Sequence, residues 1–81
     1  MDDRVLAIVV NCTGLTEIGL DTDLWAAGMS SLQSVSVMLA VETEFDVELP
    51  ESLLVRTTFS TVARLSAAVW AQLSGDIDVA S

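Results

Sequence analysis

Two adjacent serines, Ser30 and Ser31, stand where the sequence changes from a loop to an uninterrupted helical pattern. Gly28 lies just before them, and no charged side chain occurs from Ser31 to Val41. The start of a helix has unpaired backbone N–H groups and the positive end of the helix dipole, so it is a favourable place for a phosphate group. A serine hydroxyl here is suited to carry a group through a phosphodiester. Serine is also a preferred N-cap residue, and taken alone this pair is more typical of a cap than of a modification site.

The other residues that could do chemistry are few. The sequence has no His, Lys or Tyr, and Cys12 is its only cysteine. A serine or cysteine nucleophile would have only a carboxylate as its base, and a zinc site built from His and Cys is excluded by the counts. Cys12 has no partner for an internal disulfide, and its apolar helical surroundings are typical of a small core residue. The sequence therefore predicts a protein that is not an enzyme, and we expect no metal. An ion site with oxygen ligands among the acids is the alternative, which is only weakly indicated because no Asp-x-Asp-x-Asp-Gly loop is present.

The charge balance restricts the partners. Twelve acids stand against three arginines, which gives a net charge of −9. Such a surface disfavours nucleic acid and anionic membranes, and it favours protein partners with basic patches. The acidic start does not resemble a secretory signal, and the run from Val5 to Val10 is too short to span a bilayer. We expect a soluble cytoplasmic protein, and a monomer because no coiled-coil seam is visible.

The apolar spacing predicts an all-α domain, a small four-helix bundle with three main helices and one short one. The expected helices cover about residues 2–13, 31–45, 51–55 and 61–74, with the short one third in order. The whole chain, residues 1–81, is expected to form one domain with its core at about 3–73 and a frayed tail at 76–81. A turn, or a one-turn helix capped by Asp21 or Thr22, is expected within the long connection 15–30.

The later helices carry more detailed expectations. Leu53 and Leu54 of the short third helix are expected to point inward. In the fourth helix, capped by Ser60 or Thr61, Leu73 takes an apolar position and Trp70 rests at the edge of the core.

The helix from Ser31 to Phe45 carries two apolar stripes. Residues spaced by four, namely Val37, Val41 and Phe45, are assigned to the core, with Ser34 and Met38 on their flanks. The second stripe consists of Leu32, Val35 and Leu39. Because a helix in a small bundle usually buries one face, we expect this second stripe to be at least partly exposed and to form a docking face beside Ser31. The alternative is that both stripes are buried.

These residues together resemble a known family. The segments that carry the resemblance are Asp21-Thr22-Asp23-Leu24-Trp25, Gly28-Met29-Ser30-Ser31-Leu32, Val41-Glu42-Thr43-Glu44-Phe45-Asp46-Val47-Glu48-Leu49-Pro50 and Phe59-Ser60-Thr61-Val62. Over about Val5 to Val69 the chain is similar to acyl and peptidyl carrier proteins. The pentad alone is a weak signal, but the pentad followed at this distance by Glu-x-x-Phe-x-x-x-x-Pro in a short acidic chain is specific.

The resemblance implies a four-helix fold in which Ser31 carries 4′-phosphopantetheine, placed there from coenzyme A by a phosphopantetheinyl transferase. The thiol of that arm would hold cargo as a thioester and deliver it between enzymes. Gly28, Ser30 and Leu32 complete the attachment motif, and Leu32, Val35, Leu39, Glu42 and Glu44 are the expected docking residues.

Two departures from the family pattern bear on this interpretation. Ser30 stands where the family usually has Asp, which makes Ser30 a second possible acceptor of the phosphopantetheine group, in competition with Ser31. Gln33 and Ser36 occupy early helix positions that are acidic in many fatty-acid carriers, so we infer a specialised partner with a more apolar docking surface.

A finer resemblance, from Ser34 to Glu42 and from Leu53 to Phe59, is to stand-alone carriers of amino acids. Those carriers are loaded by ligases that resemble aminoacyl-tRNA synthetases. We prefer this interpretation slightly over a stand-alone polyketide or fatty-acid carrier. An unmodified helical interaction module is the alternative from another class of function.

Overall fold

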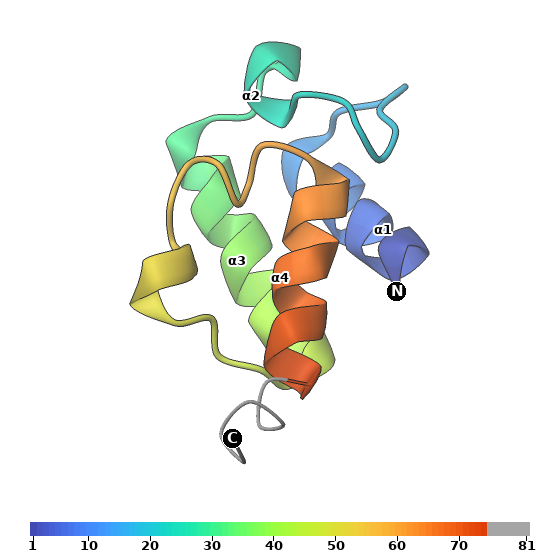
Figure 1. The fold of residues 1–81 in the computed structure, drawn as a ribbon. Helices are drawn as coiled ribbons and strands as arrows, with labels where there is room; N and C mark the ends of the chain where they lie inside the picture. The colour runs from blue at the N-terminus through green and yellow to red at the C-terminus, as the bar shows by residue number, and fades with distance from the viewer. Residues whose placement is uncertain (75–81) are drawn as a thin grey trace.

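The computed structural model describes residues 1–74, and all the regular structure in that range is helical (Figure 1). The elements in chain order are α1 (Asp2–Thr13), α2 (Leu24–Ala27), α3 (Ser31–Phe45), the 3₁₀ helix η1 (Glu51–Leu53) and α4 (Val62–Ser74). Helix α1 packs against both α3 and α4. The predicted all-α fold, with three long helices and a short helix before the last, is confirmed.

The ends of the helices have local causes in the sequence. Helix α1 stops at Gly14, which takes a left-handed conformation with φ of 73° and donates its N–H to Val10 O. Helix α3 ends at Asp46, also left-handed with φ of 53°. Helix α4 begins after Thr61, whose hydroxyl accepts the N–H of Arg64 at 3.0 Å. Thr61 is therefore the cap of the last helix.

The long connection from α1 to α3 is fixed by hydrogen bonds to the start of α4. The N–H of Leu24 donates to Ser60 O at 2.7 Å, and the N–H of Ala63 donates to Leu20 O at 2.9 Å. Figure 1 shows α2 lying across the end of the bundle where α3 begins. These bonds hold the loop that leads into Ser30 and Ser31 at a defined place on the bundle.

The core lies between the three long helices and is almost entirely aliphatic. Its buried members are Val5, Val9, Leu24, Met29, Val37, Val41, Leu49, Phe59, Val62, Leu65 and Val69. Burying a Val or Leu side chain completely contributes about 1.5–3 kcal/mol. Val37 and Val41 therefore fix the face of α3 that turns inward, and that choice leaves the opposite face of α3 in solvent.

Several finer expectations were wrong. The short helix is one 3₁₀ turn that ends at Leu53, and Leu54 is 41% exposed because it lies past the helix end on the rim of a groove. Asp23, rather than Asp21 or Thr22, caps α2, because its carboxylate accepts the N–H groups of Trp25 and Ala26.

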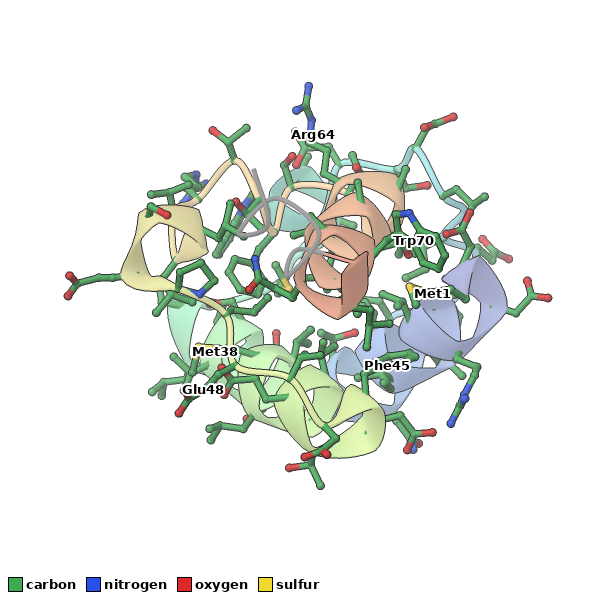
Figure 2. The ribbon with its side chains drawn as sticks, turned by 60° about the horizontal axis from the view of Figure 1, so that its bottom comes forward. Met1, Met38, Phe45, Glu48, Arg64 and Trp70 are labelled. Carbon is green, nitrogen blue, oxygen red and sulfur yellow. The ribbon has the colours of Figure 1, made fainter. Side chains whose placement is uncertain are left out.

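The last turns of α4 are also more exposed than expected. Trp70 is 62% exposed and Leu73 is 43% exposed, whereas Val69 on the inner face of α4 is fully buried. Figure 2 shows Trp70 beside Met1 on the outside of the molecule. The expected tail at 76–81 lies outside the described residues.

None of the helices in residues 1–74 combines the length and the apolar character needed to cross a membrane. Within the same range, no group of three or more His, Cys, Asp or Glu side chains is arranged to hold a metal ion.

Candidate functional site

The two serines have different roles at the start of α3. Ser30 is the N-cap: its hydroxyl accepts the N–H of Gln33 at 3.1 Å, and the Gln33 side chain accepts the N–H of Ser30 at 2.9 Å. This reciprocal pair is a capping box. The Gln33 side chain also donates to Thr13 O at 3.3 Å, which joins the start of α3 to the end of α1. Ser30 and Gln33 together therefore fix the first turn of α3.

Ser31 is the first helical residue and is exposed. Its backbone carbonyl accepts the Ser34 hydroxyl at 2.6 Å, whereas its own hydroxyl makes no hydrogen bond to any described residue. A free hydroxyl at the positive end of a helix is accessible to a modifying enzyme, and the N–H groups and dipole of the helix favour an anionic product. Ser31 thus has the accessibility and the surroundings that a phosphodiester requires.

The turn before the serines depends on Gly28. This residue ends α2 with φ of 119°, a backbone conformation that other residues rarely adopt. The N–H of the next residue, Met29, donates to Leu24 O at 3.0 Å, and the Met29 side chain is buried. Gly28 therefore allows the chain to reverse, so that Met29 enters the core while Ser30 and Ser31 stay at the surface.

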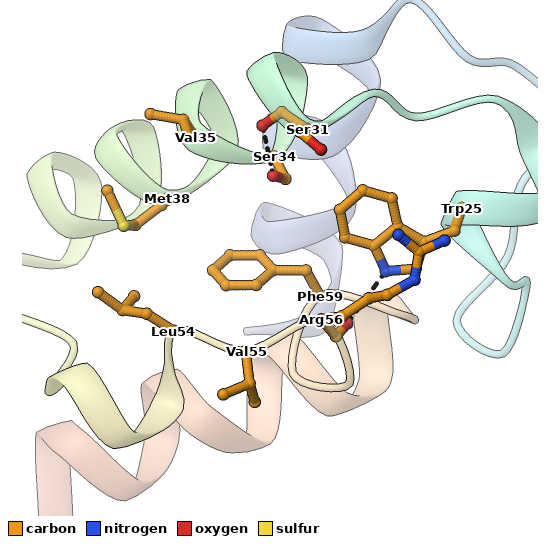
Figure 3. Close-up of a pocket in the computed structure, with 9 residues that line it drawn as sticks. All are labelled: Trp25, Ser31, Ser34, Val35, Met38, Leu54, Val55, Arg56 and Phe59. Atoms are coloured by element: carbon orange, nitrogen blue, oxygen red, sulfur yellow. Dashed lines mark hydrogen bonds between the residues drawn. The ribbon is translucent and has the colours of Figure 1, made fainter.

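An apolar groove of about 400 Å³ opens beside Ser31 (Figure 3). One wall comes from α3, and the facing wall comes from the segment after η1 and from α2. Its lining residues are Trp25, Ser31, Ser34, Val35, Met38, Leu54, Val55, Arg56 and Phe59. A group attached to Ser31 would therefore start at one end of a mostly apolar channel.

Among residues 1–74, Arg56 is the only charged residue that lines this groove. Its guanidinium lies 4.2 Å from the centre of the Trp25 ring, which is a cation–π contact. The Trp25 indole N–H donates to Arg56 O at 3.0 Å. Among the described residues, no carboxylate lies within ion-pair distance of Arg56. The groove thus has a fixed positive group that is not neutralised within residues 1–74.

The predicted docking stripe on α3 is exposed. Leu32 is 82% exposed, Val35 48% and Leu39 54%. We call these three residues the apolar row; Val35 also lines the groove, so the row and the groove form one continuous surface. The expectation that the second stripe faces solvent is confirmed, because Val37 and Val41 occupy the buried face.

The two acids predicted for docking make contacts within the chain. The half-buried Glu42 accepts the N–H of Leu49 at 2.9 Å, and so holds the extended segment that follows α3. Glu44 forms an ion pair with Arg4 of α1, and the Arg4 guanidinium also lies 5.2 Å from the centre of the Phe45 ring. Both acids therefore connect α3 to other segments, and of the two only Glu44 has its negative charge offset by a cation.

Most of the groove was not foreseen as part of the site. Leu54 was expected to point into the core, and Trp25, Arg56 and Phe59 lie in segments between the expected helices; in the structure Trp25 lines the groove while it also packs against the core. One signal was available: Ser31, Ser34, Val35 and Met38 are spaced by three and four, and so lie on one face of α3. Apart from Trp25, the facing wall comes from residues more than 20 positions after Ser31, which no local pattern could have brought there.

Comparison with known proteins gives one family. Residues 3–69 match the family profile described as phosphopantetheine attachment site. This range covers most of the chain and contains the whole of the groove and the apolar row.

The proteins that are similar to this chain include a carrier protein and a chain in a solved complex. The aminoacyl carrier protein of Agrobacterium fabrum is 40% identical over 63 residues, which are 78% of this chain and 76% of the relative. A crystal structure of an engineered Bradyrhizobium japonicum glycine:[carrier protein] ligase, complexed with a carrier protein from Agrobacterium tumefaciens and AMP, contains a similar fold with a TM-score of 0.80. That match is 34% identical and covers 86% of this chain and 99% of the other.

Proposed function

The chain belongs to the phosphopantetheine-binding carrier protein family, and from this premise we propose that it carries an aminoacyl group on an arm attached to Ser31. The family assigns the cofactor, which is 4′-phosphopantetheine, and a carrier role in place of catalysis. When bound, the arm supplies a thiol on which an activated acyl group is held as a thioester. What this chain contributes is the attachment point, the docking surface and the walls of the groove.

The free hydroxyl of Ser31 is the observation that carries the assignment. Ser30 and Ser31 both precede Leu32, but the Ser30 hydroxyl is engaged as the helix cap, whereas the Ser31 hydroxyl has no partner among residues 1–74. Modification of Ser30 would cost the cap, which contributes about 1 kcal/mol. Modification of Ser31 leaves the capping box intact. These contacts favour Ser31 over the neighbouring serine.

The attachment reaction itself is a phosphoryl-group transfer. The Ser31 oxygen loses its proton and forms a bond to the phosphorus of coenzyme A that bears the pantetheine. The bond from that phosphorus to the bridging oxygen breaks, and adenosine 3′,5′-bisphosphate leaves. The product carries one negative charge beside the first turn of α3, where the helix dipole favours it. The base for the proton comes from the transferase, because this chain has no His, Lys or Tyr and no carboxylate of residues 1–74 lines the groove beside Ser31.

The similar proteins support an aminoacyl cargo. One is an aminoacyl carrier protein, and the other forms a complex with a glycine:[carrier protein] ligase that also contains AMP. We infer that this chain is loaded by an amino acid:carrier protein ligase of the same kind. The partner would dock on the apolar row, since Leu32, Val35 and Leu39 lie on the helix that begins with Ser31.

An acyl cargo is the second candidate. The observation in its favour is the groove itself, which has about 400 Å³ of mostly apolar space beside Ser31. Such a groove suits an aliphatic chain better than a charged aminoacyl group, because burying an ammonium group without a partner is costly. The two candidates differ in which enzyme accepts the modified protein.

The test begins with intact mass and tandem fragmentation after incubation with coenzyme A and a broad-specificity transferase. We expect a single added phosphopantetheinyl group on Ser31. Ser31→Ala should abolish the addition, whereas the matched control Ser30→Ala should keep it and lose about 1 kcal/mol of stability. Addition to Ser30, or none while a control carrier is modified in parallel, would contradict the attachment. The latter result favours an unmodified interaction module.

The cargo is tested with the modified protein in a second step. Glycine:[carrier protein] ligase, ATP and a set of amino acids should add one aminoacyl mass that hydroxylamine removes, as expected for a thioester. If the modified protein instead accepts only aliphatic acids, supplied by an acyl-activating enzyme, the second candidate is correct.

A further inference from the structure

The groove beside Ser31 contains a positive charge that the carrier role does not by itself explain. In a chain with a net charge of −9, the Arg56 guanidinium faces a groove lined otherwise by uncharged residues. Of the other arginines, Arg4 is paired with Glu44, and Arg64 does not line the groove. Arg56 is thus the one arginine placed at the same groove as the attachment serine.

Two contacts with Trp25, one at its indole N–H and one at its ring face, fix the position of Arg56. The indole N–H holds the backbone carbonyl of Arg56 at 3.0 Å, and the indole face holds the guanidinium at 4.2 Å. Stacking uses the flat face of a guanidinium, and its N–H donors lie at the edge of that plane. The edge therefore remains free to bind an anion. Because the stack already restricts the side chain, binding loses less conformational entropy than it would with a free arginine.

We propose that Arg56 binds the phosphodiester of the arm on Ser31 and thereby directs the first part of the arm into the groove. Figure 3 shows Ser31 at the start of α3, with its hydroxyl on the side that faces Trp25 and Arg56. A guanidinium is the cation best matched to phosphate oxygens, because it donates in a planar fork. This inference rests on the proposed attachment at Ser31.

The proposal also explains why a cation lies on an otherwise acidic protein at this place. Phosphate is the anion that modification adds, and it arrives at the end of the groove that Arg56 lines. The contact is exposed to solvent, so we expect it to be weakened by salt. Once the phosphate is held, the amide-bearing part of the arm lies along Val35, Met38 and Phe59.

The test is phosphorus NMR of the modified protein, after mass spectrometry has established one group on Ser31. The reference is the same protein unfolded in urea, in which the phosphodiester has no fixed neighbour. In the folded wild type we expect a shifted and broadened phosphorus signal. Arg56→Gln should move the signal towards the unfolded reference, and so should 1 M salt, at which the Debye length is about 3 Å. Arg56→Lys should retain part of the shift, since it keeps the charge but loses the planar fork.

Arg64→Gln is the matched control, because it removes the same charge from an exposed arginine outside the groove. It should leave the phosphorus signal unchanged. The indole N–H signals give a second readout: modification of Ser31 should shift that of Trp25 and leave that of Trp70, on the exposed part of α4, in place. The Trp25 hydrogen bond goes to a backbone carbonyl, so its signal also shows whether the Arg56 variants keep the local fold.

The outcomes separate the two proposals. Absence of the group from Ser31 in the mass spectrum overturns the attachment, and this inference with it. A correctly modified protein whose phosphorus signal is the same in wild type, Arg56→Gln and Arg64→Gln overturns the role of Arg56 alone. If Arg56→Gln then slows loading by the ligase without moving the phosphorus signal, Arg56 meets an acidic group of the partner, and the arm contact is wrong.

Discussion

The side-chain amide of Gln33 donates to the backbone carbonyl of Thr13 at 3.3 Å while its oxygen accepts the N–H of Ser30 at 2.9 Å. One side chain thus joins the last turn of α1 to the first turn of α3, directly beside Ser31. The family usually has an acid before the modified serine. Here Ser30 and Gln33 form the capping box of α3, so a serine is structurally compatible with this position.

Gln33→Ala should lower the free energy of unfolding by about 1–2 kcal/mol, because it removes both hydrogen bonds. Gln33→Glu keeps an acceptor for the Ser30 N–H but cannot donate to Thr13 O, so its loss should be smaller than that of the alanine variant. Urea denaturation followed by circular dichroism measures both. Equal losses in the two variants would show that the bond back to Ser30 contributes nothing.

Gly28→Ala should be destabilising by about 1–3 kcal/mol, since its φ of 119° is strained for any residue with a Cβ. The cause is the backbone, because the nearest atom to an added Cβ, the Leu15 Cδ2, is at an ordinary contact distance of 3.8 Å. Gly19→Ala is the matched control: it has similar space and no positive φ, so its stability should change little or rise by about 0.4–1 kcal/mol. Thermal and urea unfolding of the pair tests this, and equal effects would contradict the backbone explanation.

Leu39→Asp should weaken docking of the loading ligase by about tenfold or more and change folding stability by no more than about 0.5 kcal/mol, because the side chain is 54% exposed on the apolar row. The control is Leu73→Asp, a leucine that is 43% exposed on α4 and outside the row. Ligase KM with each modified variant, together with urea unfolding, separates the two effects. If Leu39→Asp loses binding and stability in proportion, the residue belongs to the core and the docking proposal fails.

The Arg4–Glu44 pair should contribute little. Their side chains are 62% and 43% exposed, so solvent screens the attraction. A double-mutant cycle with Arg4→Gln and Glu44→Gln should give a coupling energy below about 1 kcal/mol at low salt, and a smaller value at 1 M salt. A coupling of several kcal/mol would mean that Arg4 and Glu44 act in a larger network, with the Phe45 ring as a candidate member.

The sequence by itself determined the features that depend on neighbours within one helix. The bounds of α3 follow from a serine cap at Ser30 or Ser31 and from an apolar period that stops at Phe45. The structure has the same bounds and identifies Ser30 as the cap. The exposure of Leu32, Val35 and Leu39 follows from the same period, because a helix that buries Val37 and Val41 must turn the other stripe outward. Capping and periodicity act between residues three or four positions apart, so they can be read directly from the chain.

Only the tertiary structure decided which distant residues meet at the site. Trp25 and Arg56 are 31 positions apart, and Arg4 and Glu44 are 40 apart. The orientation of Leu54 depended on where the 3₁₀ turn ended in the packed structure. A helix of one turn has too few residues for the spacing of apolar side chains to predict which face is buried. The groove that adjoins Ser31 exists because the loop bonds at Leu24 and Ala63 bring α2 and the start of α4 to the same end of the bundle. Such contacts arise from packing between elements, and no local pattern specifies them.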